Sequence, residues 1–225
     1  DLKYYAESVN FSDSYNFLAV ANSQYGTHIL GVENNVEHPR IKVLQLKSTA
    51  LSKPDGYART RNHKHAILGT GSDARYIYVA DQEYGLLIYR INPTDLTVAP
   101  LLNASLRYID PVDIYSRALL WRCYISPSDP NLLYIGTQRG VLLLVDITDR
   151  ANPVLKSSLI TSSNANYPNG YGYIYDIVED TIDSNVVYVV NSYYGILAVD
   201  KKNTSAPTII GSYVQSGITS ISIKE

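Results

Sequence analysis

The sequence contains little sulfur: its 225 residues include one cysteine and no methionine. A single cysteine, Cys123, cannot form an internal disulfide framework or a cysteine-rich zinc site. A chain of this size buries about 70% of the surface of its unfolded form, so it needs no such cross-link. Because no methionine is present to start translation, we expect a processed chain or a segment of something longer.

Charge is scarce as well. Charged residues make up 18% of the chain, and the two signs nearly cancel to a net charge of −2. Nucleic-acid and anionic-membrane binding require a basic surface, which this balance argues against. No apolar run reaches the roughly 18 residues of a membrane span, and no signal peptide is visible. We expect no nucleic-acid partner and no membrane insertion.

The sequence does contain one pattern that repeats four times: an apolar run, a short polar turn, a glycine and a second apolar run. The glycines lie 59, 55 and 55 residues apart, and a proline follows each one after 12 to 15 residues. The four glycines are Gly26, Gly85, Gly140 and Gly195. The pattern divides the chain into repeats over approximately 1–50, 63–105, 117–160 and 171–214.

The apolar runs have five to seven residues and are rich in Val, Ile, Leu and Tyr, which predicts β-strands. A polar turn ending in glycine predicts a hairpin, and no segment sustains a helical period. Each repeat holds about four strands; the fourth is expected to place them at 173–178, 187–191, 196–200 and 208–213. Four antiparallel strands per repeat are typical of a propeller blade. The sequence therefore predicts an all-β chain, a single β-propeller domain over 1–225 with about four four-stranded blades.

Two segments carry a resemblance to a known family. YVVNSYYGILAVD (188–200) and LVDITDRANPVLKSSL (144–159) resemble the LVIVD-repeat propellers. The resemblance is strongest over 75–91 and 131–213 and weakest over 1–46, and the repeat period of about 55 residues is longer than is usual in that family. It implies a propeller, often in secreted or cell-surface proteins, and it brings no catalytic motif.

The residues after the fourth repeat, GITSISIKE, alternate in polarity and predict one more first strand of a blade, over 217–223. An unpaired strand edge is an aggregation hazard that proteins normally cover. Three explanations stay open: a fragment of a larger propeller, an intramolecular clasp, or strand addition to a neighbouring subunit. Strand addition repeated head to tail builds an open filament. The residues expected to mediate it are Ile218, Ile221 and Ile223.

The connections between repeats are long, polar and rich in tyrosine, with arginines nearby. Tyrosine and arginine are enriched at protein interfaces, and aromatic faces also suit sugar rings. The interaction face predicted on this basis consists of Tyr57, Tyr108, Tyr115, Tyr167 and Tyr171. The alternative is that these tyrosines only cover the ends of the blades.

No constellation of catalytic residues stands out. The pair His63 and His65 lacks a third metal ligand nearby and is expected in a solvated loop. Asp180 and Asp183 are expected to form a turn, because the calcium-loop spacing is missing. Cys123 has no base near it in sequence and is expected to be a buried thiol. A cation held by Glu7, Asn10, Asp176 and Glu179 is the enzymatic alternative. We expect no catalytic, cofactor or metal site.

Three sequons, at Asn10, Asn103 and Asn203, are candidates for N-glycosylation. Together these observations favour a non-enzymatic propeller, secreted or at the cell surface, with a structural or adhesive role. We expect it to self-associate and to need no cofactor. The alternatives are a cation-dependent, lactonase-like hydrolase and a carbohydrate-binding module with glycan partners.

Overall fold

The structure, a computed structural model, describes residues 6–12, 17–23, 26–31, 63–70, 73–92, 98–101, 119–162 and 170–223. Within these ranges the chain forms strands β1 to β15, arranged in four antiparallel sheets, and no α-helix. The prediction of an all-β fold with four blades is thereby confirmed. No helix in this part of the chain has the length and apolar character needed to cross a membrane.

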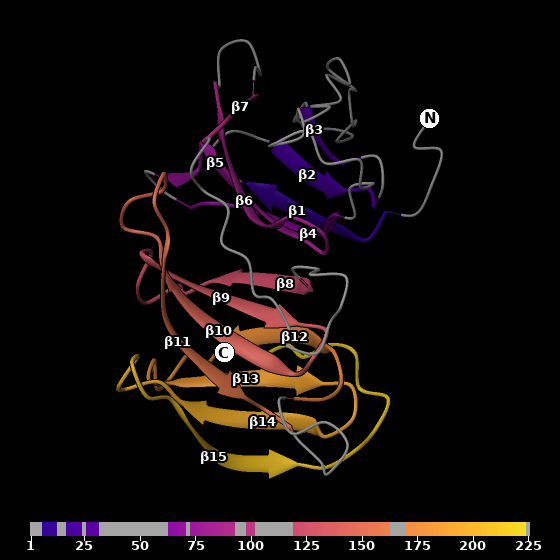
Figure 1. The fold of residues 1–225 in the computed structure, drawn as a ribbon, viewed down its shortest axis with the longest axis vertical. Coiled ribbons are helices and arrows are strands. Elements are labelled where there is room, and N and C mark those ends of the chain that lie inside the picture. Colours follow the sequence, from indigo (N-terminus) through magenta and orange to yellow (C-terminus); the bar gives the residue numbers. More distant parts are fainter. Residues whose placement is uncertain are drawn as a thin grey trace, which may run out of the picture. The chain divides into compact units, whose positions relative to one another are not determined.

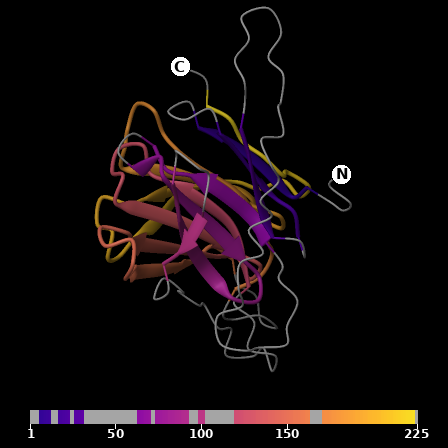
Figure 2. The ribbon, with the colours of Figure 1, turned by 90° about the horizontal axis from the view of Figure 1, so that it is seen from above.

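The chain divides into two compact units, and the first is Asp1–Arg107. It contains two sheets, whose strands follow one another in chain order (Figure 1). The first sheet consists of β1 (Ser8–Ser12), β2 (Phe17–Ala21) and β3 (Thr27–Gly31). The second consists of β4 (His63–Leu68), β5 (Tyr76–Asp81), β6 (Gly85–Ile91) and β7 (Val98–Pro100). In Figure 2 the magenta arrows of this second sheet cross at visible angles, as the twist of antiparallel strands requires.

The second unit, Tyr108–Glu225, contains two four-stranded sheets. One consists of β8 (Leu120–Ile125), β9 (Leu132–Thr137), β10 (Val141–Asp146) and β11 (Val154–Ile160). The other consists of β12 (Ile174–Glu179), β13 (Val186–Asn191), β14 (Gly195–Asp200) and β15 (Thr208–Tyr213). The fourth-repeat strand predicted over 208–213 agrees with β15 residue for residue. Whether 1–225 is one domain stays a prediction.

The second and third strands of every sheet form the predicted hairpin. The turn glycines Gly26, Gly85, Gly140 and Gly195 all have positive φ, between 63° and 97°. This conformation is costly for any residue with a side chain, which is why glycine marks the repeat. A polar residue caps the turn: Asp81 Oδ1 accepts the N–H of Tyr84 at 2.6 Å, and Asn191 Oδ1 accepts that of Tyr194 at 3.2 Å.

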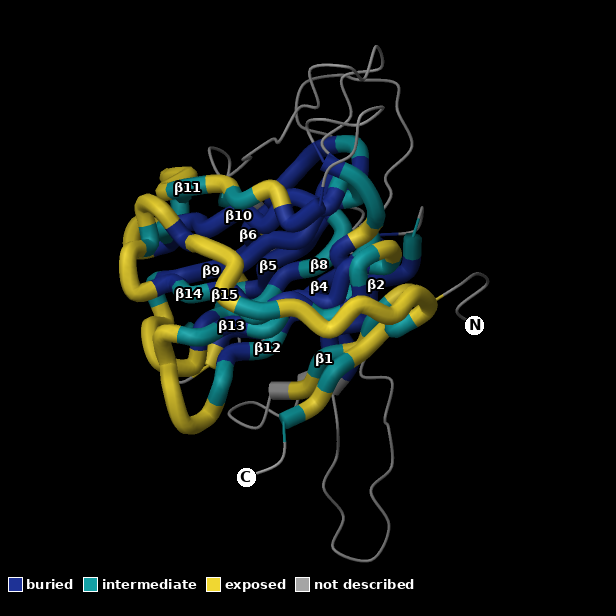
Figure 3. The backbone as a smooth tube through the Cα atoms, turned by 90° about the horizontal axis from the view of Figure 1, so that it is seen from below, coloured by how far each residue is buried: buried dark blue, intermediate teal, exposed yellow. Residues whose placement is uncertain are grey.

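Burial is greatest in the middle strands of the second and third sheets. The middle strands β5, β6, β9 and β10 are almost wholly buried, whereas β11 is mostly exposed (Figure 3). Even the tyrosines of the middle strands are packed: Tyr78 and Tyr134 are fully buried and their hydroxyls donate to Asp73 and Glu179. The long apolar runs that mark the repeats are therefore the buried centres of the blades.

The segment after β15 departs from its prediction. No strand is assigned between Tyr213 and residue 223, so the extra strand predicted over 217–223 does not form as a strand in the described residues. The segment nevertheless contacts the fourth blade, because the backbone N–H of Ile221 donates to Asp176 Oδ2 of β12 at 3.0 Å. A side chain, rather than a backbone ladder, binds it to the sheet.

Candidate functional site

The pairing registers identify equivalent positions in the first strands of the four blades. In each blade we define the anchor position as the first-strand residue that pairs with the residue just before the polar turn cap. The four pairs are Ser8 with Ala21, His65 with Ala80, Arg122 with Gly136, and Asp176 with Val190. The residue before the anchor is a β-bulge in β4, β8 and β12, so one additional side chain projects there in each strand.

In the first unit, β1 and β4 are neighbours, and side chains of β1 bind the backbone of β4. The anchor Ser8 accepts the N–H of Ala66 on its Oγ at 3.1 Å. Two residues further along β1, Asn10 Oδ1 accepts the N–H of Leu68 at 2.9 Å. These bonds matter because a buried N–H without an acceptor costs free energy comparable to a lost hydrogen bond.

In the second unit, β8 and β12 are neighbours in the same way (Figure 1). The anchor Arg122 donates from Nη2 to Asp176 Oδ1 at 2.6 Å. Two residues further along β8, Tyr124 Oη accepts the N–H of Glu179 at 3.2 Å. By register, Tyr124 stands where Asn10 stands in β1, and Glu179 stands where Leu68 stands in β4. The same backbone group is therefore satisfied by a different side chain.

The terminal segment repeats this contact once more. The anchor Asp176 accepts the N–H of Ile221 through Oδ2, just as the anchor Ser8 accepts the N–H of Ala66. Ile221 thus stands where the first strand of a following blade would place its residue after the anchor. Ser220 then corresponds to the anchor itself, the position that Ser8 holds in β1. The three predicted residues Ile218, Ile221 and Ile223 are all half-buried, whereas the residues between them are exposed.

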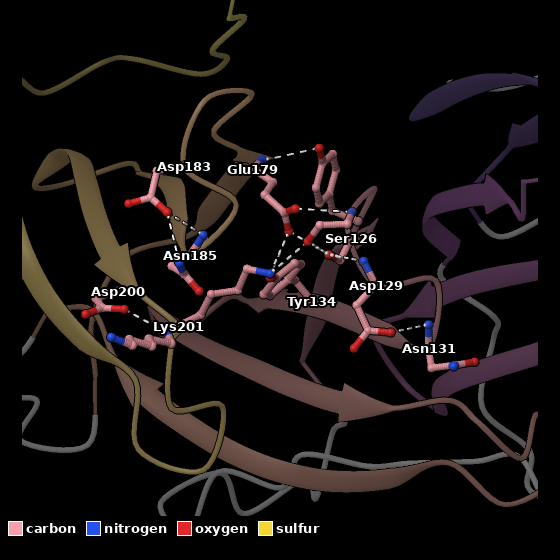
Figure 4. Close-up of polar contacts among 12 residues, drawn as sticks. Ser126, Asp129, Asn131, Tyr134, Glu179, Asp183, Asn185, Asp200 and Lys201 are labelled. Atoms are coloured by element: carbon pink, nitrogen blue, oxygen red, sulfur yellow. Dashed lines mark hydrogen bonds and ion pairs between the residues drawn. The ribbon is translucent and has the colours of Figure 1, made fainter.

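A buried charged cluster lies at the opposite end of β12. Glu179 faces Lys201 with their side-chain atoms 3.0 Å apart, and the two side chains are only 3% and 8% exposed (Figure 4). The carboxylate also accepts from Ser126 Oγ at 2.6 Å and from the Tyr134 hydroxyl at 3.2 Å. Lys201 Nζ lies 5.9 Å from the centre of the Tyr134 ring. The cluster connects the third and fourth blades.

Electrostatics keep this cluster ionised. Burial by itself would raise the pKa of Glu179, but hydrogen bonds from Ser126, Ser128 and Lys201, with the charge of Lys201, hold that pKa below its ordinary value. The pKa of Tyr134 is raised, first by burial and then by the negative charge of Glu179. The tyrosine therefore stays protonated and acts as a hydrogen-bond donor, while the glutamate acts only as an acceptor.

Aromatic side chains gather where β8 and β12 begin. The rings of Trp121 and Tyr173 lie edge to face, with centroids 5.0 Å apart, and Tyr173 stacks on Tyr175 at 5.8 Å. Tyr171 lies edge to face with Tyr193 at 4.8 Å. Tyr173 and Tyr193 are 39% and 54% exposed, so this end of the unit presents aromatic surface.

Only part of the predicted interaction face can be placed. Tyr171 belongs to the aromatic group just described, whereas Tyr57, Tyr108, Tyr115 and Tyr167 lie outside the described residues. The sequon at Asn103 also lies outside them. Asn203 is exposed, and its side chain accepts the N–H of Ser205. The sequon at Asn10 lies in β1 at the junction with β4. Glycosylation at all three sites stays a prediction.

The proposed cation ligands are not brought to one point. Glu7 pairs with Lys64 at 2.8 Å, and Asn10, Asp176 and Glu179 are engaged in the blade contacts above. Within the described ranges, no three His, Cys, Asp or Glu residues are grouped so as to hold a metal ion.

Three smaller expectations can also be compared with the structure. Asp180 and Asp183 form the predicted turn, and Cys123 is buried as predicted, which raises the pKa of its thiol to about 12. The prediction of a solvated loop at His63 and His65 is wrong. Both residues lie in β4, because its ladder with β5 extends past the apolar residues to His63.

Lys201 was not among the predicted site residues, although the repeats contain a signal for it. In three blades a residue at the end of the third strand donates its N–H to the carbonyl of the residue just before the second strand. The donors are Ile91, Ile147 and Lys201. A lysine at a position that is otherwise isoleucine indicates a buried partner of opposite charge. Comparing the repeats with one another would have shown this.

Comparison with known proteins agrees with this architecture. The LVIVD repeat matches residues 74–99 and 129–161. The chain carries LVIVD repeats. The resemblance inferred from the sequence is thus confirmed in the second and third blades. No curated protein sequence matches the chain.

Solved structures show the same fold at low sequence identity. A 6-phosphogluconolactonase from Bacteroides uniformis is 8% identical, with a TM-score of 0.62 over 92% of this chain. The β-propeller domain of Cps50 (Swd1) from Myceliophteria thermophila is 13% identical, with a TM-score of 0.56 over 93%. The periplasmic gluconolactonase PpgL from Pseudomonas aeruginosa is 12% identical, with a TM-score of 0.58 over 92%. The LVIVD-repeat chain spans 54%, 60% and 56% of these three chains, respectively.

Proposed function

We propose that this LVIVD-repeat propeller is a non-enzymatic structural or adhesive protein, secreted or at the cell surface, that self-associates by strand addition. The observation that carries the proposal is the hydrogen bond from Ile221 to Asp176. By this bond, residues 218–223 lie where the first strand of a further blade would lie. The described residues include no other strand of that further blade. A strand from a second copy can complete that blade, since strand addition satisfies the backbone groups of an open edge.

The use of the first-strand carboxylates supports a non-enzymatic role. A catalytic cation requires several oxygen ligands that converge on it. Here Asp176 and Glu179 instead form hydrogen bonds between blades, and Glu7 is paired with Lys64. Each carboxylate of this set therefore has a structural partner that a metal ion would have to displace.

The experiment that tests self-association compares the whole chain with a variant lacking residues 218–225. Sedimentation equilibrium gives the mass of each, and far-UV circular dichroism shows whether the shortened chain keeps its β-structure. We expect the whole chain to form assemblies of larger mass than the shortened chain, and the shortened chain to stay folded. Equal masses for the two folded proteins would contradict strand addition through this segment.

The lactonases among the structural neighbours give a second candidate function, cation-dependent hydrolysis of a sugar lactone. Their identity of 8% and 12% carries the fold only, so this candidate depends on metal binding by Glu7 or Asp176. Metal analysis of the purified protein decides between the two. A stoichiometric divalent ion that is lost in Asp176→Ser and Glu7→Gln would favour the hydrolase; a folded, metal-free protein would remove it.

A further inference from the structure

The outermost strand of the fourth blade, β15, exposes several large apolar side chains. β15 is the last strand of its sheet in the described residues, so no strand pairs with its outer side there. Its side chains are exposed on both faces: Ile209 is 41% exposed, Ile210 58% and Tyr213 60%. Val214, directly after the strand, is 70% exposed. Long apolar edges of this kind template pairing with another chain.

The outer strand of the third blade is protected in ways that β15 is not. β11 also exposes apolar residues, but it carries Lys156, whose Nζ lies 3.9 Å from Asp146. A lysine on an edge strand is a common device against pairing. Ser157 of β11 further donates to the carbonyl of Thr204 at 2.7 Å, which ties this edge to the neighbouring blade. β15 contains no charged residue at all.

We propose that β15 pairs edge to edge, antiparallel, with β15 of a second copy of this chain. Such a contact is two-fold symmetric, so each copy contributes the same strand. The absence of charge on β15 means that self-pairing brings no like charges together, and the net charge of −2 adds little long-range repulsion. A strand of a different protein would require no such neutrality, which is why a second copy is the favoured partner.

This inference rests on the proposed self-association but assigns it a second contact, independent of residues 218–223. A head-to-tail contact through the terminal segment extends a filament in one direction. A two-fold contact through β15 joins two such filaments side by side. The two contacts together are suited to building a fibre bundle or a layer.

The test substitutes one exposed residue on each outer strand. Ile210→Lys places a charge at the centre of the β15 edge, and Val154→Lys places one on β11, where Val154 is 60% exposed. Both variants are made in the chain lacking 218–225, and sedimentation equilibrium gives their masses. We expect the shortened chain to be a dimer at high concentration, the Ile210→Lys variant to have half that mass, and the Val154→Lys variant to remain a dimer. Thermal unfolding checks that both variants fold.

The outcomes separate the two proposals. A folded Ile210→Lys protein that remains dimeric overturns the pairing of β15, and so does a shortened chain that is monomeric at every concentration. Self-association through 218–223 stands in both cases if the whole chain still has a larger mass than the shortened one. If the whole chain is also monomeric at every concentration, both proposals fail.

Discussion

Two blade junctions in the described residues, β1 with β4 and β8 with β12, satisfy the same backbone groups with different side chains. Between β1 and β4, the acceptors are neutral: Ser8 and Asn10 bind backbone N–H groups directly. Between β8 and β12, the same places hold Arg122 and Tyr124, and an ion pair and a phenol hydroxyl form the contacts. In both junctions, the backbone N–H three residues after the anchor of the second strand, that of Leu68 or of Glu179, has a side-chain acceptor. The comparison shows that the fold fixes which backbone groups need acceptors and leaves the chemistry of the acceptors open.

The second difference is charge. The junction of the second unit buries Glu179 with Lys201, where the first unit has Leu68 at the position of Glu179 and Ile91 at that of Lys201. Buried ion pairs add little net stability over apolar residues of similar volume, but losing one partner is costly. We therefore expect the second unit to respond at this position to pH and to single charge deletions, whereas Leu68 and Ile91 of the first unit carry no charge that could respond.

The largest effect is expected from removing one partner of the buried pair. Glu179→Leu leaves the charge of Lys201 buried and unpaired, so the free energy of unfolding should fall by about 3 to 5 kcal/mol. The double variant Glu179→Leu with Lys201→Ile installs the residue types found at Leu68 and Ile91. It removes the unpaired charge but still takes the acceptor from Ser126 and Tyr134, so in a urea titration it should recover part of the stability lost in the single variant. A double variant as unstable as the single one would contradict the equivalence of these positions.

The next effect is expected at the two neutral acceptors. Asn10→Ala leaves the N–H of Leu68 without its acceptor, and Tyr124→Phe does the same to the N–H of Glu179. Each should lower the free energy of unfolding by about 1 to 3 kcal/mol. The measurement is chemical denaturation of both variants side by side. If one costs nothing while the other is destabilising, the two junctions do not share this requirement.

The response to acid should distinguish the two charge patterns. Because the pKa of Glu179 is lowered in the folded protein from the ordinary value of 4.5, its ionised form stabilises the fold fully above that pH. The contribution is lost as the pH falls further, through the lowered pKa. Below pH 4.5, the free energy of unfolding should therefore fall more for the wild type than for the double variant Glu179→Leu with Lys201→Ile. A difference that does not change with pH would show that Glu179 does not titrate with folding.

The smallest effect is expected at Glu7 and Lys64, which lie one residue before their anchors, at the positions that Trp121 and Tyr175 hold in β8 and β12. Their side chains are 27% and 13% exposed, so solvent screens the pair. Glu7→Gln should cost about 0.5 to 1 kcal/mol, and the cost should shrink in high salt. Thermal unfolding at low and high salt measures it. A cost that is larger than that of Asn10→Ala would reverse the ranking.

The sequence predicted the repeat because the repeat is a local pattern. Glycine at the positive-φ position of the hairpin and the apolar middle strands both follow from short-range requirements, so the strands expected over 187–191 and 196–200 fall within β13 and β14. The loop expected at His63 and His65 was wrong because a buried ladder overrides the polar character of these residues. The long-range pairing of β4 with β5 decides that these two residues belong to a strand.

The site was less predictable for the same reason. Ser8, Asn10 and Tyr124 are ordinary residues in sequence, and they become acceptors only when two blades lie together. The contacts of Glu179 with Ser126 and Tyr134 join two different repeats, so the spacing of residues along the chain carries no sign of them. The alternation of the terminal segment predicted a strand that does not form, and its docking on a side chain of β12 was visible only in three dimensions.

The central claim is that Ile221 takes the place of a residue in the next first strand by donating its N–H to the anchor Asp176. Amide hydrogen exchange at Ile221 tests this most directly. We predict slow exchange in the wild type and fast exchange in Asp176→Ala. In Asp176→Ser we predict exchange close to that of the wild type, because Ser8 performs the same task in β1. Exchange at Ile221 as fast as at Ser220 in the wild type, or unchanged by Asp176→Ala, would contradict the claim.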